Sequence, residues 1–233
     1  MEAVSTTTAS LDDATSCMQA GKLDDALSIL MDADDVHGRP LSDRAIRDEL
    51  FLLIFGGHET TAIALAWFWY VLASHPDEQE RVADEVRTVL RGARPTATDR
   101  DRLPRLRQAI LESMRVFPPF WGSWREAVAD CQVAGEPIER GSWVMVSQWL
   151  AHRDPRHYDD PHAVCPARWS ETGKATPRGP DYFPFGLGPR SCIATGFAMS
   201  EITLIAAAVI QRFRFSPAPG QPVRMHPSFT LRP

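Results

Sequence analysis

A single cysteine occupies a position from which it could bind a metal. Cys192 follows a loop rich in glycine and proline, residues 183–191, and precedes an apolar run, residues 193–213, whose spacing predicts a helix. The positive end of a helix and a nearby cation, here Arg190, both favour the thiolate over the thiol. A cysteine beside a helix is more often a buried structural residue. The surrounding loop favours the other interpretation, a soft thiolate ligand for a metal.

A polar cluster interrupts the longest apolar segment of the chain. Residues 50–73 are mostly apolar, and a helix of this length would be long enough to cross a bilayer. Glu59 and Thr60 lie in its middle, within the polar stretch 56–61, where an acid costs about 2.5 to 3.5 kcal/mol on an insertion scale. Such groups are costly inside an apolar helix unless they are satisfied or functional. We therefore expect a long helix of a soluble protein, no membrane span, and a role for the cluster.

Two opposite charges lie three residues apart on another predicted helix. Glu112 and Arg115 share one face of the helix expected from residue 103 to Pro118, so they can form an ion pair. Most pairs of this kind are solvated and contribute less than about 1 kcal/mol. If the pair is buried, removing one partner costs about 3 to 5 kcal/mol. The spacing alone leaves both alternatives open.

Composition limits the remaining possibilities. The 233 residues are 44% hydrophobic and 24% charged, as in ordinary globular proteins, and the net charge of −5 gives no positive excess for binding nucleic acid. The four cysteines form no CxxC pair, which argues against a zinc ribbon and against a disulfide framework. Residues 1–13 lack the basic start and apolar run of a secretory signal, so a cytoplasmic location is expected. One further set of possible zinc ligands matches no closed-site spacing: His152, His157, His162 and Cys165.

The elements that must position these residues are mostly helical. Apolar periodicity and turn residues predict helices over 22–32, 42–74, 77–91 and 103–117 and one that follows Cys192. Short strands and hairpins are expected over 124–150, a long functional loop over 151–191, and a last strand near the C-terminus. The predicted fold class is mostly α with small antiparallel β-sheets. Residues 1–40 are expected to form a loose or partly helical lead-in to a main domain, residues 41–233.

The cysteine loop resembles the haem-binding loop of the cytochrome P450 family. The family pattern Phe-x-x-Gly-x-Arg-x-Cys is matched by Phe185, Gly188, Arg190 and Cys192, and Gly186 lies within it. The resemblance implies that Cys192 is the thiolate ligand to the iron of haem b, and that Arg190 contacts a haem propionate. The chain departs from the family at residue 194, where Ala194 replaces the usual glycine and adds a methyl group beside the haem face.

The polar cluster and the charged pair occur in the family's order along the chain. Residues 56–61 resemble the family's oxygen-activating groove, and the resemblance implies that Glu59 and Thr60 help to deliver protons during oxygen activation. Arg125, beyond the double proline 118–119, matches a further propionate partner.

In the family, the charged pair is buried and a second arginine joins it. The matching residue here is Arg168, so the expected structural cluster is Glu112, Arg115 and Arg168. Near this arginine, Val164 and Ala167 replace the usual Phe and Glu of the family.

The implied fold is the C-terminal portion of a soluble, bacterial-type cytochrome P450. The implied activity is that of a haem-thiolate monooxygenase that inserts one oxygen atom from O₂ into an apolar small molecule. Electrons would come from a ferredoxin and ferredoxin-reductase-type donor fed by NAD(P)H. The resemblance covers only the second half of a family member, whose first half supplies the pocket lid and part of the haem wall. The alternative is therefore a truncated or degenerate fragment that binds haem without independent catalysis.

Overall fold

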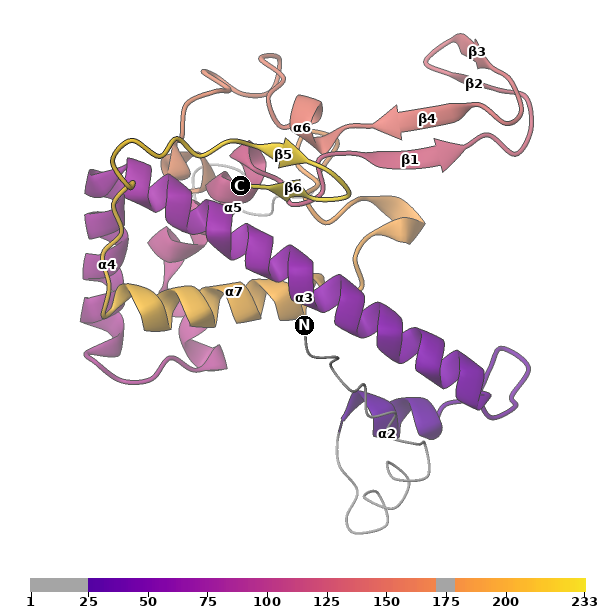
Figure 1. Ribbon diagram of the computed structural model, residues 1–233, viewed down its shortest axis with the longest axis horizontal. Coiled ribbons are helices and arrows are strands. Elements are labelled where there is room, and N and C mark those ends of the chain that lie inside the picture. Colours follow the sequence, from indigo (N-terminus) through magenta and orange to yellow (C-terminus); the bar gives the residue numbers. More distant parts are fainter. Residues whose placement is uncertain (1–24, 171–178) are drawn as a thin grey trace, which may run out of the picture. The chain divides into compact units, whose positions relative to one another are not determined.

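The computed structural model describes residues 25–170 and 179–233 of the chain (Figure 1). The chain falls into two units, one that ends at Gly56 and one that runs from Gly57 to Pro233, and the boundary lies within the longest helix. Of the lead-in predicted for residues 1–40, residues 1–24 lie outside the described part of the chain. Among the described residues, every buried hydrophobic side chain except that of Ile46 belongs to the second unit.

From residue 25 onward, the first unit holds one short helix and the start of a long one. α2 (Ala26–Met31) begins after Asp25, whose carboxylate accepts a hydrogen bond from the backbone N–H three residues later at 2.8 Å. α3 (Asp43–Ser74) begins after Ser42, whose hydroxyl accepts the corresponding bond at 3.3 Å. The predicted bounds of this long helix, residues 42–74, are confirmed.

Three helices pack with the second part of α3 to form the core of the second unit. They are α4 (Pro76–Leu90), α5 (Pro104–Val116) and α7 (Thr195–Ile210). Each presents apolar residues at steps of three or four, which lie on one face of a helix and can be buried together. Fully buried members of this cluster include Leu72, Val82, Val86, Leu106, Ala109, Ala206, Ala207 and Ile210.

α3 is the one helix of residues 25–170 and 179–233 that is long and apolar enough to cross a membrane by length and composition. Its two parts differ in exposure. From Ile63 to Ala73 it contributes Ala64, Phe68 and Leu72 to the core, as a core helix does. Large apolar side chains are exposed in its first part, at Phe51, Leu52, Leu53, Ile54 and Phe55.

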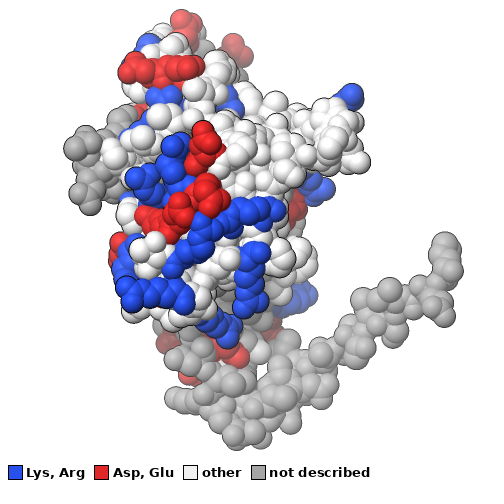
Figure 2. Space-filling view, turned by 90° about the vertical axis from the view of Figure 1, so that its left-hand side faces the viewer, with Lys and Arg blue, Asp and Glu red and all other residues white. Residues whose placement is uncertain are grey.

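The outer face of α4 is charged, and its charges are paired. Arg81 lies 3.0 Å from Glu78, while Glu80 pairs with Arg87 at 2.6 Å and with Arg214 at 3.0 Å. Hydrogen bonds from Arg214 and then Arg87 lower the pKa of the Glu80 carboxyl to about 2. Figure 2 shows acidic and basic side chains interleaved on one face of the molecule. The helix predicted over residues 77–91 is confirmed.

Two-stranded antiparallel sheets make up the β structure of the described residues. β1 (Ser123–Glu126) pairs with β4 (Trp143–Val146), and β2 (Cys131–Val133) pairs with β3 (Glu136–Ile138) at the tip of that pair (Figure 1). Ala134 and Gly135 join β2 to β3, and both have positive φ, as a tight two-residue hairpin turn requires. β5 (His226–Pro227) and β6 (Leu231–Arg232) form a small hairpin at the C-terminus. The predicted class, mostly α with small antiparallel sheets, is confirmed.

Short helical turns complete the second unit. They are η1 (Ala97–Arg102), α6 (Gln148–Ala151), η2 (Pro166–Trp169) and η3 (Gly188–Arg190). η1 was not predicted from the sequence, although Thr96 and Asp99 form a capping box at its start. η2 and η3 lie in the long loop predicted over 151–191, of which residues 171–178 lie outside the described part of the chain.

Candidate functional site

The loop before α7 presents Cys192 on the surface. Its backbone turns sharply at Gly186 and Gly188, whose φ angles are 75° and 70°. These angles lie in the left-handed region, which residues with a Cβ atom rarely adopt. The Cys192 N–H donates to the Phe185 carbonyl at 2.8 Å, and the Thr195 hydroxyl donates to the Cys192 carbonyl at 2.9 Å. These bonds fix the backbone on both sides of the sulfur. The side chain of Cys192 itself is exposed just before the N-terminus of α7.

Large apolar side chains surround the cysteine in the chain and are exposed with it. Ile193 is 97% exposed and Phe197, one turn into α7, is 73% exposed. A Cβ added at Gly188 would meet no atom within 4 Å, so the loop leaves open space there. Exposed apolar surface of this kind is typical of a site that binds an apolar ligand.

These residues fit a haem. A porphyrin supplies four nitrogen ligands to its iron, so the protein needs to add one axial donor, and a thiolate is one of the donors that haem iron accepts. Cys192 offers a single exposed sulfur beside an exposed apolar surface, which is the donor and the contact that such a group requires. Within the described residues, no group of three or more His, Cys, Asp or Glu could hold a metal ion by itself.

The two arginines expected at the propionates lie on different elements. Arg190 ends η3, two residues before Cys192, and is exposed. Arg125 lies on β1, is exposed, and donates to the Trp124 carbonyl at 2.8 Å. Ala194, the residue that replaces the family's glycine, is the N-cap of α7.

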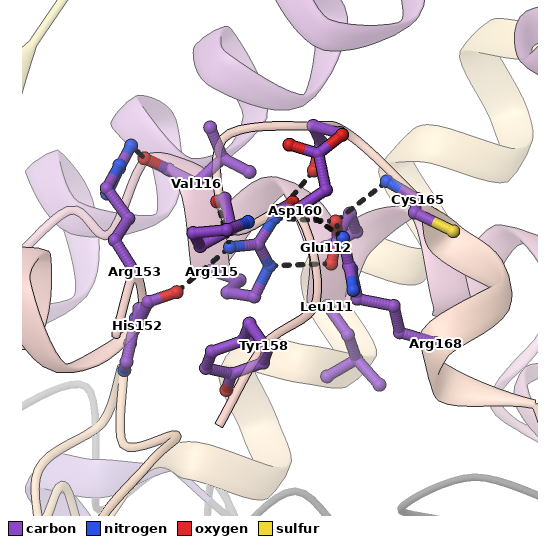
Figure 3. Close-up of polar contacts among 12 residues, drawn as sticks. Leu111, Glu112, Arg115, Val116, His152, Arg153, Tyr158, Asp160, Cys165 and Arg168 are labelled. Atoms are coloured by element: carbon purple, nitrogen blue, oxygen red, sulfur yellow. Dashed lines mark hydrogen bonds and ion pairs between the residues drawn. The ribbon is translucent and has the colours of Figure 1, made fainter. Parts of the chain in front are cut away.

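Glu112 and Arg115 form a fully buried ion pair (Figure 3). Both side chains are 0% exposed, and two parallel bonds join them, from Arg115 Nε to Glu112 Oε2 at 3.0 Å and from Nη2 to Oε1 at 2.8 Å. Arg168 lies beside the pair, with its Nε 3.5 Å from Glu112 Oε1. At this separation the contact of Arg168 is an ion pair rather than a hydrogen bond, and Arg168 Nε has no hydrogen-bond partner. The structure therefore brings the three predicted cluster residues together.

Further hydrogen bonds satisfy the remaining polar atoms of the buried pair. Glu112 also accepts bonds from the Cys165 N–H at 2.8 Å and the Trp169 indole at 2.9 Å. Arg115 donates to the backbone carbonyls of His152 at 2.9 Å, Pro161 at 2.7 Å and Ala163 at 2.8 Å. Since these partners span residues 152–169, the pair fastens the long loop to α5.

Two contacts extend this fastening to the cysteine loop. The Tyr182 hydroxyl donates to the Leu111 carbonyl at 2.9 Å, and the Phe183 N–H donates to His152 Nε2 at 2.9 Å. Phe185, two residues later, packs against the core and accepts the bond from Cys192. The buried pair thus acts on the sulfur indirectly, because it holds the loop from which the cysteine is presented.

His152 is a neutral acceptor in this arrangement and is not free to bind zinc. Its ring is fully buried and stacks on Tyr182 with centroids 5.0 Å apart. Burial lowers the pKa of His152 to about 3, so the ring is uncharged at neutral pH. Because Nε2 accepts the bond from Phe183, the zinc set containing His152 loses a ligand. Neither His152 nor Trp169 was singled out for this role from the sequence.

We expect the buried histidine to make the protein less stable in mild acid. The unfolded chain takes up a proton on His152 near pH 6.5, whereas the folded protein does so only near pH 3. Stability is therefore lost as the pH falls, by about 1 kcal/mol between pH 6 and pH 5. Urea unfolding at both pH values measures this loss. His152→Gln should show a smaller loss, while the exposed His157→Gln should behave like the wild type, and equal losses in all three would contradict the assignment.

Glu59 and Thr60 lie on α3, in the second unit, and both are half-buried. The Glu59 carboxylate accepts hydrogen bonds from the Thr230 hydroxyl at 2.7 Å and from the Arg232 guanidinium, at 2.7 Å from Nη2. These bonds, Thr230 first and Arg232 second, lower the pKa of Glu59. Sequence analysis could not find either partner, because they lie more than 170 positions away and belong to no motif.

Comparisons with known proteins point to one protein family. The family model for cytochrome P450 matches residues 2–233. The chain is 38% identical over 213 residues to cyclooctatin synthase of Streptomyces melanosporofaciens. This match covers 91% of the chain and 46% of that protein. It is 37% identical over 212 residues to cytochrome P450 4F5 of Rattus norvegicus, and this match covers 89% of the chain and 40% of that protein. The chain therefore spans about half the length of the curated relatives it matches.

The chain also superposes on about half of each of two solved cytochrome P450 structures. A cyanobacterial CYP120A1 with bound retinoic acid superposes with a TM-score of 0.87 at 35% identity, over 95% of this chain and 52% of that one. A cytochrome P450 named CYP102L1 superposes with a TM-score of 0.84 at 28% identity, over 96% of this chain and 52% of that one.

Proposed function

Because this chain belongs to the cytochrome P450 family, we propose that it is the haem-binding part of a monooxygenase that inserts one oxygen atom from O₂ into an apolar small molecule. The family supports haem-dependent monooxygenase chemistry in general. The observation that carries the proposal for this chain is the exposed sulfur of Cys192, which a glycine loop presents beside exposed apolar side chains. Residues 41–233 form the proposed haem-binding region, with residues 1–40 as a lead-in.

The residues around the cysteine have distinct proposed roles in holding haem b. Cys192 is the thiolate ligand to the iron, and it lies just before the N-terminus of α7. Arg190 and Arg125 are exposed cations able to pair with the two carboxylates of a haem. The glycines and Phe185 keep the loop thin and attached to the core, so that a flat ligand can approach.

Bound haem would supply the activation of O₂, and residues of this chain would supply protons. Glu59 can take up and release a proton at its carboxylate, and Thr60 carries a hydroxyl at the next position of α3. Both are half-buried in a helix whose following turns enter the core. This placement supports the proposal that they deliver protons to the reacting oxygen.

The proposed partners follow from the same chemistry. The substrate is an apolar small molecule. The similar CYP120A1 structure has such a molecule, retinoic acid, bound to it. The electrons come from a ferredoxin and ferredoxin-reductase-type donor, and the proposed location is the cytoplasm.

A second candidate function is haem binding without independent catalysis. It is favoured by the exposed apolar side chains in the first part of α3, such as Phe51, which is 71% exposed. In the unit that holds them these side chains lie in water, which costs stability.

Isotope labelling separates the two candidates. The haem-loaded chain is supplied with NADPH, a ferredoxin, its reductase, ¹⁸O₂ and a panel of apolar substrates, and products are analysed by mass spectrometry. The monooxygenase proposal expects one ¹⁸O atom per product molecule. Haem uptake without labelled product would favour the second candidate, and failure to take up haem would contradict both.

A further inference from the structure

The carboxylate of Glu59 is held by the C-terminal hairpin. Three donors converge on its Oε1 atom, namely the Thr230 hydroxyl at 2.7 Å, Arg232 Nε at 3.0 Å and Arg232 Nη2 at 2.7 Å. The Glu59 side chain is 30% exposed and that of Arg232 is 58% exposed, whereas Thr230 is buried. The ion pair is therefore within reach of solvent, but its hydroxyl partner is not.

The residue between the two donors anchors the hairpin. Leu231 is buried against Ile63 and Trp67 of α3. Its N–H donates to the Pro119 carbonyl at 2.8 Å, and its carbonyl accepts a bond from the Trp67 indole at 2.7 Å.

This anchor fixes where the two donors point. Thr230 directly precedes Leu231 and Arg232 directly follows it, so the buried Leu231 holds the backbone between them, and both donors reach the same Oε1 atom of Glu59. Both donors are thereby aimed at Glu59, and their placement depends on the hairpin rather than on a loose terminus.

We propose that Thr230 and Arg232 are positioning residues that hold the Glu59 carboxylate ionised and turned toward the C-terminal hairpin, so that Glu59 delivers a proton only when this contact loosens. The inference rests on the proposed role of Glu59 in proton delivery. It adds that two residues of the C-terminal hairpin, Thr230 and Arg232, control when the Glu59 carboxylate is protonated.

The charges around Glu59 agree with this role. The Thr230 hydroxyl, Arg232 and, more weakly, the neighbouring His58 lower the pKa of Glu59, while burial opposes them. A carboxylate held in this way accepts a proton less readily than a free one. Opening the Arg232 contact removes both a charge and two hydrogen bonds, so Glu59 becomes easier to protonate.

The first test measures the protonation of Glu59 directly and needs no haem. The chain is labelled with ¹³C at glutamate carboxyls, the Glu59 signal is assigned by its loss in Glu59→Gln, and its midpoint is followed by NMR as the pH is varied. In the wild type the midpoint should lie below that of an ordinary glutamate. It should rise in Arg232→Gln and in Thr230→Val, and rise less in Arg232→Lys, which keeps the charge.

Arg224→Gln is the matched control, because Arg224 is an exposed arginine of the same C-terminal segment. It should leave the Glu59 midpoint at the wild-type value. Backbone amide NMR shifts of Leu231 and the indole N–H shift of Trp67 verify that each variant keeps the anchored hairpin. Midpoints that stay at the wild-type value in both Arg232→Gln and Thr230→Val would overturn the proposal.

The second test uses turnover of the haem-loaded chain. In Arg232→Gln the ratio of kcat at pH 5.5 to kcat at pH 7.5 should rise about twofold or more, with KM unchanged, because proton delivery follows the protonated fraction of Glu59. Arg224→Gln should keep the wild-type ratio. An unchanged ratio in an active Arg232→Gln enzyme would overturn the positioning role. Absence of turnover in the wild type would instead count against the proposed function, and the NMR titration would still decide whether the hairpin holds Glu59.

Discussion

Replacing Cys192 by alanine is expected to abolish thiolate ligation of haem completely. The wild-type chain, loaded with haem and reduced under carbon monoxide, should give the long-wavelength Soret band that is typical of a thiolate ligand. The alanine variant has no sulfur in the loop before α7, so the one axial donor that this loop offers to the iron is removed. The band should therefore be absent, whether or not the variant keeps some haem by apolar contact.

The other cysteines of the described residues provide the control for this experiment. Cys131 is exposed on β2, and Cys165 is half-buried beside the ion-pair cluster. Cys131→Ala should leave the spectrum unchanged, since an exposed thiol on a hairpin has no reason to contact the haem. A thiolate band that survives in Cys192→Ala, or that disappears in Cys131→Ala, would place the ligand elsewhere.

Replacing Glu112 by glutamine should cost about 3 to 5 kcal/mol of folding free energy. The substitution keeps the shape of the side chain but leaves the buried guanidinium of Arg115 without its counter-charge, and both side chains are fully inaccessible to water. Folded domains are stable by only about 5 to 15 kcal/mol, so this loss would unfold a substantial part of a marginal protein. Urea unfolding monitored by tryptophan fluorescence measures it.

A surface pair offers the matched comparison. Glu80 also accepts hydrogen bonds from two arginines, but its side chain is 54% exposed. Glu80→Gln should leave the unfolding free energy close to that of the wild type, because water replaces the lost contacts. If Glu112→Gln were as mild as Glu80→Gln, the buried pair would not be what holds the 152–169 segment on α5.

The long helix and its neighbours could be predicted because their signals are local. The hydroxyl of Ser42 caps the start of α3, and Pro76 begins α4 just after α3 ends. Residues next to each end of α3 therefore indicate where the helix begins and ends. The same holds for the end of α5 before Pro118. η1 was not predicted, because residues 94–102 are rich in charges and carry no apolar periodicity, although Thr96 and Asp99 form a cap at its start.

Only those parts of the candidate site that belong to a local sequence motif could be predicted. The spacing of Glu112 and Arg115 indicated a pair, but burial is decided by Trp169 and Cys165, which arrive from a distant loop. The partners of Glu59 are further away still, since Thr230 and Arg232 approach it only after the C-terminal hairpin docks on Trp67. Contacts of this kind depend on the tertiary fold and leave no periodic pattern in the sequence.

The most direct measurement is X-ray absorption at the iron edge of the haem-loaded chain. A ligand sphere of four porphyrin nitrogens and one sulfur is expected for the wild type, and the sulfur contribution should vanish in Cys192→Ala. A wild-type iron surrounded by nitrogen and oxygen alone, or a sulfur signal that persists without Cys192, would contradict the assignment of the site.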